Sequence, residues 1–300
     1  MSDLRFDGRV AVVTGAGQGL GRAHALAFAA RGAKVVANDA GEEVDGTARE
    51  ETGDRAAAVV AEIQRAGGVA LADTNDVATP DGARGLIEAA LDTFGRIDIL
   101  VNNAGILRDR SFQNITVEEW DAVLDVHLRG AFLVSRAAFE HLREHGYGRI
   151  VNTTSSSGLF GNFGQSNYAA ATMAIVGLTK TLAIEGASYD ISANAVAPLA
   201  HTRMTKDTLP REGAAKMAPE QVTPLVAWLA HEDCPTTGEI YSAGGGRFAR
   251  VFIAEGGGVV LPNASVEDIS DNWPDINAER PYVIPRDRRE QVEAHMQTLK

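Results

Sequence analysis

The chain has one cysteine, Cys234, among its 300 residues. A lone cysteine excludes an intrachain disulfide and any metal centre built from several cysteines, so we expect no metal and a reducing, cytoplasmic setting. No run of eighteen apolar residues occurs, and the N-terminal stretch lacks the apolar core of a signal peptide. We therefore expect no membrane span.

Basic residues are also scarce. The sequence contains 28 Lys and Arg against 40 Asp and Glu, which gives a formal charge of −12. Such a charge disfavours contact with a polyphosphate backbone or an anionic bilayer, so neither nucleic acid nor a membrane is an expected partner. Hydrophobic residues are plentiful at 45%, enough to bury the core of one large α/β domain.

A glycine-rich turn follows the first apolar segment. Val10–Thr14 has the pattern of a buried strand, and residues 22–31 beyond the turn have helical composition. Glycines in such a turn let the backbone approach a phosphate, and the helix N-terminus offers free N–H groups. We expect a dinucleotide pyrophosphate here, and the alternative is a flexible turn without a ligand. The residues expected around the pyrophosphate are Gly15, Gln18, Gly19, Leu20 and Gly21.

An acidic residue ends the second strand pattern. Asp39 follows Lys34–Asn38 and lies eighteen residues after Gly21, where a dinucleotide fold carries the acid that binds the adenosine ribose. Its charge repels a 2′-phosphate and Gln18 offers no positive charge, so we expect NAD rather than NADP. The alternative is that Asp39 only begins a turn. Residues 40–53 are expected to form an exposed loop without chemistry.

Strand and helix patterns alternate as far as Ala243. This alternation predicts an α/β fold of the Rossmann type, a doubly wound parallel sheet of seven strands with helices on both faces, over residues 1–246. The polar segment 199–218 is expected to be a mobile flap. Residues 247–300, rich in Gly and Pro, are expected to be a C-terminal extension with a short helix after Ser265, packed on the core or on a neighbouring subunit.

Polar segments also follow two later strand patterns, the fourth at Ile97–Val101 and the fifth at Arg149–Thr154. Asn102–Gly105 follows the fourth, and Ser155 follows the fifth. Tyr168 lies on the first turn of a helix expected to begin near Asn167. In open α/β sheets ligands bind beyond the carboxyl ends of the strands where the strand order reverses. We therefore expect these segments to meet the glycine turn at one site.

These motifs, in this order and spacing, resemble the short-chain dehydrogenase/reductase family over residues 6–246. The segments 102–112, 161–165 and 182–186 are similar to its (3R)-hydroxyacyl-CoA dehydrogenase branch, found in peroxisomal multifunctional enzymes and bacterial relatives. The resemblance implies oxidation of a 3-hydroxyacyl-CoA with NAD, with a steroid-derived acyl chain as one option. It also implies a homodimer or homotetramer formed through the helices after Thr116 and Asn167.

The resemblance assigns roles to several residues. Tyr168 would be the general base, and Ser155 would position the substrate hydroxyl. The family motif is Tyr-x-x-x-Lys, but Thr172 stands at the lysine position and supplies no cation to lower a tyrosine pKa of about 10. Lys180 lies about 12 Å farther along the helix, too far to replace it. For His127, which replaces the usual asparagine, an anchored water in a proton relay and simple packing are both open.

The resemblance also implies further contacts. Asp76 would touch the adenine or cap a turn towards solvent, and Arg108 and Arg110 would meet CoA phosphates or remain solvated. The other cofactor contacts implied are Val77, Asn103, Ala104, Gly105, Tyr168, Ala197 and Thr202. Two classes of function stay open, a dehydrogenase weakened by Thr172 and a catalytically silent cofactor-binding or assembly protein. We favour the enzyme, because a purely structural protein needs neither Ser155 nor Tyr168.

Overall fold

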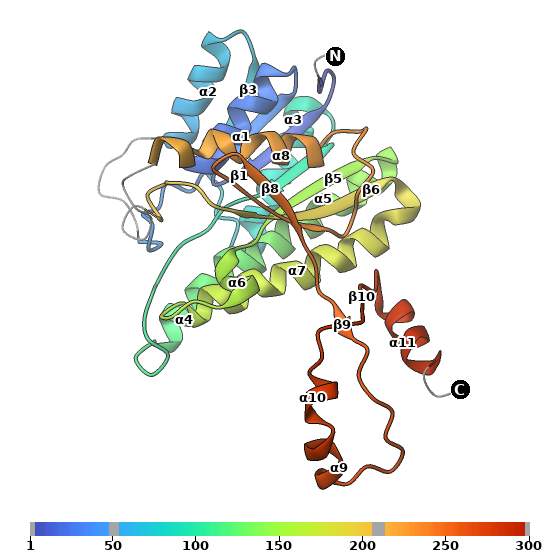
Figure 1. The fold of residues 1–300 in the computed structure, drawn as a ribbon. Helices are drawn as coiled ribbons and strands as arrows, with labels where there is room; N and C mark the ends of the chain where they lie inside the picture. Colours follow the sequence, from blue (N-terminus) through green and yellow to red (C-terminus); the bar gives the residue numbers. More distant parts are fainter. Residues whose placement is uncertain (1–3, 48–53, 206–213, 298–300) are drawn as a thin grey trace. The chain divides into compact units, whose positions relative to one another are not determined.

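The computed structural model describes residues 4–47, 54–205 and 214–297, which form two compact units, 1–250 and 251–300 (Figure 1). The first unit is built on an eight-stranded sheet. Its strands are β1 (Val10–Thr14), β2 (Lys34–Asn38), β3 (Val69–Asp73), β4 (Ile99–Asn102), β5 (Gly148–Thr153), β6 (Ile191–Pro198), β7 (Ile240–Gly244) and β8 (Arg247–Val251). They lie in the order β3-β2-β1-β4-β5-β6-β7-β8, and the strands from β3 to β7 in this order pair in parallel.

The centre of the sheet is apolar because helices cover both of its faces. Val12 on β1 pairs with Val36 on β2 and Leu100 on β4, and all three side chains are fully buried. Strands buried on both faces read as continuous apolar runs, which is the pattern of these segments. The strand order reverses at β1, since β2 lies on one side of it and β4 on the other. The carboxyl ends of β1 and β4 therefore border a ligand-binding crevice.

The expected seven strands are one too few. Gly245 and Gly246 have φ values of 58° and 79° and form a two-residue turn that leads from β7 into β8. Glycine is favoured at both positions of such a turn because both need positive φ. The five residues of β8 had been assigned to the extension, and Arg250 on this strand pairs with Glu239 at 2.7 Å.

Helices form a layer on each face, as the doubly wound prediction requires. One core cluster packs α1, α2 and α8 on the sheet, and the other packs α3, α5 and α7 (Figure 1). The helices of the first unit are α1 (Gly19–Ala30), α2 (Arg55–Arg65), α3 (Pro80–Phe94), α4 (Val117–Leu124), α5 (Ala131–His145), α6 (Ser156–Phe160), α7 (Ser166–Gly186) and α8 (Thr223–Leu229), with 3-10 turns η2 (Ala187–Tyr189), η3 (Ala214–Met217) and η4 (Pro219–Gln221). The short helix α6 was not predicted.

The helix expected after Thr116 contains an irregular segment. Its start has a capping box, in which the Thr116 side chain and Glu119 exchange hydrogen bonds with the backbone. After α4 the chain makes a π-helical segment, η1 (Asp125–Gly130), and then continues as α5. π-Helical turns of this kind are frequent at functional sites. His127 lies within it.

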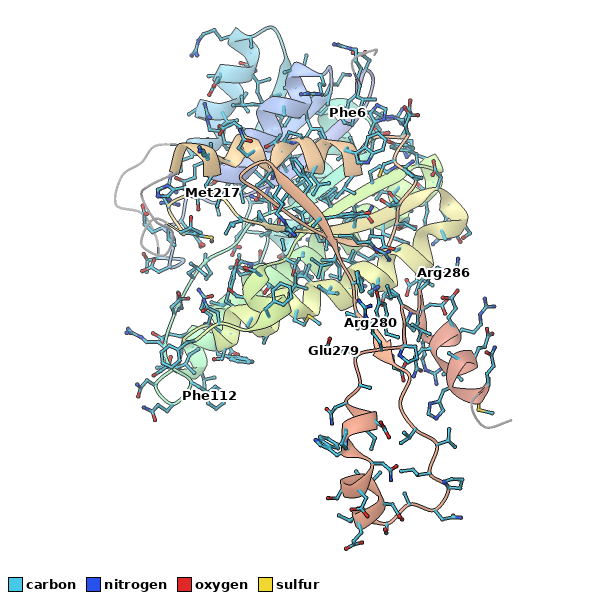
Figure 2. All side chains as sticks on the ribbon, viewed as in Figure 1. Phe6, Phe112, Met217, Glu279, Arg280 and Arg286 are labelled. Carbon is cyan, nitrogen blue, oxygen red and sulfur yellow. The ribbon has the colours of Figure 1, made fainter. Side chains whose placement is uncertain are left out.

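The second unit carries little secondary structure. Its elements are β9 (Glu255–Gly256), β10 (Tyr282–Val283), α9 (Val266–Asp271), α10 (Trp273–Ile276) and α11 (Arg288–Gln297). The short helix expected after Ser265 is α9, with Ser265 as its N-cap. No side chain between residues 251 and 297 is buried, and Figure 2 draws these side chains as sticks.

Part of the expected flap, residues 206–213, lies outside the described residues. None of the helices in the described ranges is long and apolar enough to cross a membrane.

Candidate active site

A pocket of about 390 Å³ opens beyond the carboxyl ends of β1 and β4. It brings together most of the residues expected at the site. Those in its wall are Gly15, Gln18, Gly19, Leu20, Asp39, Asp76, Val77, Asn103, Ala104, Gly105, His127, Ser155, Tyr168 and Thr202. Gly21, Ala197 and Thr172 are expected site residues that do not line it.

The glycine turn has the geometry that an anion needs. Gly15 and Gly19 have φ values of 63° and 56°, which favour glycine, and α1 begins at Gly19. The Gln18 side chain does not cap the helix, so the first N–H groups stay available to a ligand. A Cβ atom on Gly21 would lie 2.1 Å from the Gly15 carbonyl oxygen, so Gly21 allows α1 to pack directly on the turn. These residues fit a pyrophosphate.

Asp39 is fixed beside that turn. One of its carboxylate oxygens accepts a hydrogen bond from the Gly17 N–H, and the other accepts one from the Gly41 N–H, both at 2.9 Å. Asp76 is exposed and accepts a hydrogen bond from Ala78 N–H at 2.9 Å while also lining the pocket. Burial raises the pKa of Glu42, the charge of Asp76 adds to the rise, the charge of Arg108 opposes it, and the charge of Asp39 adds to it. This end of the pocket is therefore acidic.

The loop expected to have no chemistry forms part of the pocket wall. Ala40, Glu42, Glu43 and Val44 line the pocket. Leu107 N–H donates to the Val44 carbonyl at 2.7 Å, which ties the loop to the segment after β4. Arg203 also pairs with Glu43 at 2.7 Å across 160 positions of sequence. No local sequence signal indicates contacts of such long range.

Ser155 and Tyr168 both line the pocket wall and lie close enough for the serine hydroxyl to act on the pKa of the phenol. Ser155 lies two residues after β5 and caps α6, where its hydroxyl accepts from Ser157 N–H at 3.1 Å. Tyr168 lies on the first turn of α7. Burial raises the pKa of Tyr168, the hydrogen bond with Ser155 lowers it, and the charge of Asp109 raises it. The phenol is therefore protonated at neutral pH.

Thr172 lies one turn after Tyr168 on α7 and does not line the pocket. Its side chain is buried, and its hydroxyl donates to the Tyr168 carbonyl at 2.7 Å. Lys180 is also absent from the pocket wall and lies with Nζ 3.4 Å from the Gly238 carbonyl oxygen. Among the described residues, Arg203 is the one arginine or lysine that lines the pocket, and it pairs with Glu43. No lysine of those ranges replaces the one that the family motif carries.

His127 contacts both the backbone after β4 and the tyrosine. Its Nε2 lies 2.8 Å from the Ile106 carbonyl oxygen and 3.0 Å from the Ile106 nitrogen. The ring meets Tyr168 edge-on with centroids 5.0 Å apart. Burial lowers the pKa of His127 to about 4, so the ring is neutral at pH 7. A Cβ atom on Gly105 would lie 2.2 Å from this ring, which explains the glycine at that position.

The remaining expected residues are placed as follows. The Asn103 side chain donates to the Thr14 carbonyl at 2.9 Å and so joins the ends of β4 and β1. Ala197 is buried within β6, and the pocket is lined instead by the next three residues, 198–200. Arg108 donates to the Asp45 carbonyl at 2.8 Å, and Arg110 pairs with Glu119 at 3.1 Å.

A polar wall was not foreseen from the sequence. Ser157, Asn162 and Gln165 line the pocket beside Ser155 and Tyr168. Asn162 and Gln165 lie in the glycine-rich segment 161–165, for which the family resemblance implies no role of either residue. The sequence signal for these residues is the occurrence of amide side chains next to Gly161 and Gly164, directly before the start of a helix.

Residues 9–213 match the family model for short chain dehydrogenases, and the chain belongs to this family of nicotinamide-dependent oxidoreductases. It is 49% identical over 292 residues to the peroxisomal multifunctional enzyme type 2 of Mus musculus, covering 94% of this chain and 39% of the mouse protein. It is 40% identical over 273 residues to the hydroxyacyl-CoA dehydrogenase ChsB1 of Mycobacterium tuberculosis, covering 85% of this chain and 80% of ChsB1.

The solved structure of full-length peroxisomal multifunctional enzyme type 2 from Drosophila melanogaster superposes with a TM-score of 0.83 and 38% identity. The match covers 99% of this chain and 50% of that one. The chain thus spans 39% of the mouse enzyme, half of the solved Drosophila chain and 80% of ChsB1.

Proposed function

We propose that the protein oxidises a 3-hydroxyacyl-CoA to the 3-ketoacyl-CoA with NAD. The observation that carries the proposal is the Ser155–Tyr168 pair, which opens on the same pocket as the glycine turn and Asp39. The name of ChsB1, a hydroxyacyl-CoA dehydrogenase, supports the substrate class. The substrates to test range from a short acyl chain to a bulky, steroid-derived one.

An oxidised nicotinamide, when bound, supplies the hydride acceptor and a positive charge. Tyr168 takes the proton of the substrate hydroxyl, and Ser155 holds the hydroxyl oxygen within reach of the tyrosine. Neutral His127 keeps the tyrosine ring and the Ile106 backbone in place. Thr172 provides no charge to stabilise the phenolate, so we expect the reaction to be slow at neutral pH and to speed up as the pH rises towards the pKa of Tyr168.

NAD is the expected cofactor because the acidic end of the pocket repels a 2′-phosphate. Asp39 and Asp76 line this end, and Glu42 lies with them. The direct test of function follows NADH formation at several pH values from 3-hydroxybutyryl-CoA and from a steroid-derived 3-hydroxyacyl-CoA. A rate that rises with pH and disappears in Tyr168→Phe supports the enzyme.

The second candidate is a catalytically silent protein of the same fold. Its support is Thr172, together with the absence of a lysine from the described part of the pocket wall. A protein that binds NAD but forms no NADH from either substrate at any pH would favour this candidate. Tyr168→Phe should leave NAD binding unchanged, which separates loss of chemistry from loss of the cofactor site.

Assembly and setting belong to the same proposal. Phe132 on α5 and Met173 and Ile184 on α7 are 43%, 39% and 56% exposed, apolar surface that a second copy would cover. We propose a homodimer or homotetramer through these helices, with no nucleic acid or membrane partner. Light scattering that finds a monomer at micromolar concentration would refute the assembly. A reducing cytoplasmic setting fits Cys234, which is a free thiol.

A further inference from the structure

Gln165 is the centre of a hydrogen-bond network in the polar wall. Its Nε2 donates to the Asp109 carboxylate at 2.8 Å. Its Oε1 accepts from the Ser157 hydroxyl and from the Asn162 amide, each at 2.8 Å. Gln165 is 7% exposed, and what it exposes lines the pocket beside Tyr168. Asp109 is exposed to solvent and does not line the pocket.

Asp109 determines which way the amide points. An ionised carboxylate can only accept hydrogen bonds, so it must face the NH₂ group of Gln165 and not its oxygen. That orientation turns Oε1 towards Ser157 and Asn162, which occupy both of its acceptor positions. One N–H of Gln165 remains without a partner among these contacts. A substrate group that reaches Gln165 must therefore be an acceptor.

The backbone holds this arrangement in place. Arg110 N–H donates to the Gly164 carbonyl at 2.8 Å, so the residues next to Asp109 and Gln165 are joined directly. Ser157 links the network to the reacting pair, since its N–H donates to the Ser155 hydroxyl oxygen at 3.1 Å. Gln165 is the N-cap residue of α7 and precedes Tyr168 by three residues, and both residues line the pocket.

We propose that Gln165, oriented by Asp109, is a specificity-determining residue that donates a hydrogen bond to the thioester carbonyl of the substrate. This inference rests on the proposed function. Ser155 and Tyr168 take the hydroxyl oxygen on C3, and the C1 carbonyl oxygen lies only two carbons away, within reach of a side chain one turn before the tyrosine. A carbonyl accepts and does not donate, which matches the N–H that Gln165 presents. An alcohol without this carbonyl leaves the buried N–H unpaired and is disfavoured.

The test compares two ligands that differ only at C1. 3-Hydroxybutyryl-CoA carries the carbonyl, and S-(3-hydroxybutyl)-CoA is the thioether without it. Calorimetric titration of the NAD-saturated protein gives the ratio of their dissociation constants, without need of turnover. We expect the thioester to bind about three- to tenfold more tightly, the effect of one neutral hydrogen bond. Gln165→Met should bring this ratio close to one. In Asp109→Asn the asparagine amide can pair with Gln165 in either orientation of the glutamine amide, so we expect an intermediate ratio.

The ratio separates recognition from a structural role. Both ligands share the alcohol and the CoA, so a displaced loop weakens both and leaves the ratio unchanged. Gln64→Met makes the same substitution on the exposed face of α2 and should retain the wild-type ratio. Thermal melting and NAD titration report folding, and Asp109→Asn decides the question if Gln165→Met does not fold.

An unchanged ratio in Gln165→Met, or equal binding of both ligands by the wild type, would overturn the carbonyl contact alone. Wild-type protein that binds NAD and neither ligand would refute the acyl-CoA assignment, and this inference with it.

Discussion

Replacing Thr172 by lysine should place a cation next to Tyr168, the proposed general base. The two residues are one helical turn apart on α7, and the Thr172 hydroxyl is 2.7 Å from the Tyr168 carbonyl. Side chains with this spacing are neighbours, so an ammonium can lie about 5 Å from the phenol oxygen. At an effective dielectric constant of about 20, that charge stabilises the phenolate by about 3 kcal/mol, or about a hundredfold more phenolate at pH 7.

The replacement has a structural cost. Thr172 is 1% exposed, and a Cβ atom on Gly158 would lie 2.5 Å from its hydroxyl, so little room exists on that side. The lysine must turn towards the pocket, and the hydrogen bond to the Tyr168 carbonyl is lost. Thr172→Met is the matched control, because it adds a long unbranched side chain without the charge.

The assay follows NADH formation from 3-hydroxybutyryl-CoA between pH 6 and pH 10, with NAD saturating. We expect Thr172→Lys to exceed the wild type by about a hundredfold at pH 7 and by less at high pH, where the wild-type phenolate forms unaided. Thr172→Met should show no such gain. If the lysine and methionine variants have equal rates, or if the wild type is already fast at pH 7, the reasoning about the missing cation is wrong.

Three further results are expected. NAD(H) should bind at least about tenfold more tightly than NADP(H), a difference of about 1.4 kcal/mol, and Asp39→Ala should narrow this gap in calorimetric titrations. Asp109→Asn should move the pH–rate profile to lower pH, because the charge of Asp109 raises the pKa of Tyr168; an unmoved profile would contradict this. Burial lowers the pKa of His24 to about 3, so its contribution to stability is complete above about pH 6.5 and is lost as the pH falls towards 3. Between pH 8 and pH 5, the free energy of unfolding measured with urea should fall by about 2 kcal/mol less in His24→Gln than in the wild type or the exposed control His145→Gln; the loss that remains in His24→Gln includes that of His127, whose pKa burial lowers to about 4.

The sequence predicts the central sheet well because its strands are buried on both faces. Segments such as Val10–Thr14 and Lys34–Asn38 are continuous apolar runs, and the glycine turn and the capping box at Thr116 are local signals. The strand β8 was missed since a short, half-exposed edge strand such as Arg247–Val251 has no such run. Its one local signal is the glycine pair before it.

The site was harder to predict, because much of its wall depends on contacts between distant segments. Asp39 and Tyr168 could be located from motifs with fixed spacing. Glu43 lines the pocket and pairs with Arg203, 160 positions away, and no periodicity reports such a contact. Gln165 obtains its orientation from Asp109, 56 positions earlier. The direction of an amide depends on its neighbours and not on its own sequence context.

The π-helical segment Asp125–Gly130 also fixes the phase of the helix that follows it. Such a turn holds about one residue more than an α-helical turn, so the side chains beyond it are rotated by about 100° relative to an uninterrupted helix. Val134, Ala138 and Leu142 on α5 face the core only with that rotation in place. Deleting one residue from η1 would therefore displace His127 and turn the buried face of α5 away from the sheet at the same time. The site and the core are thus coupled through a single extra residue in one helical turn.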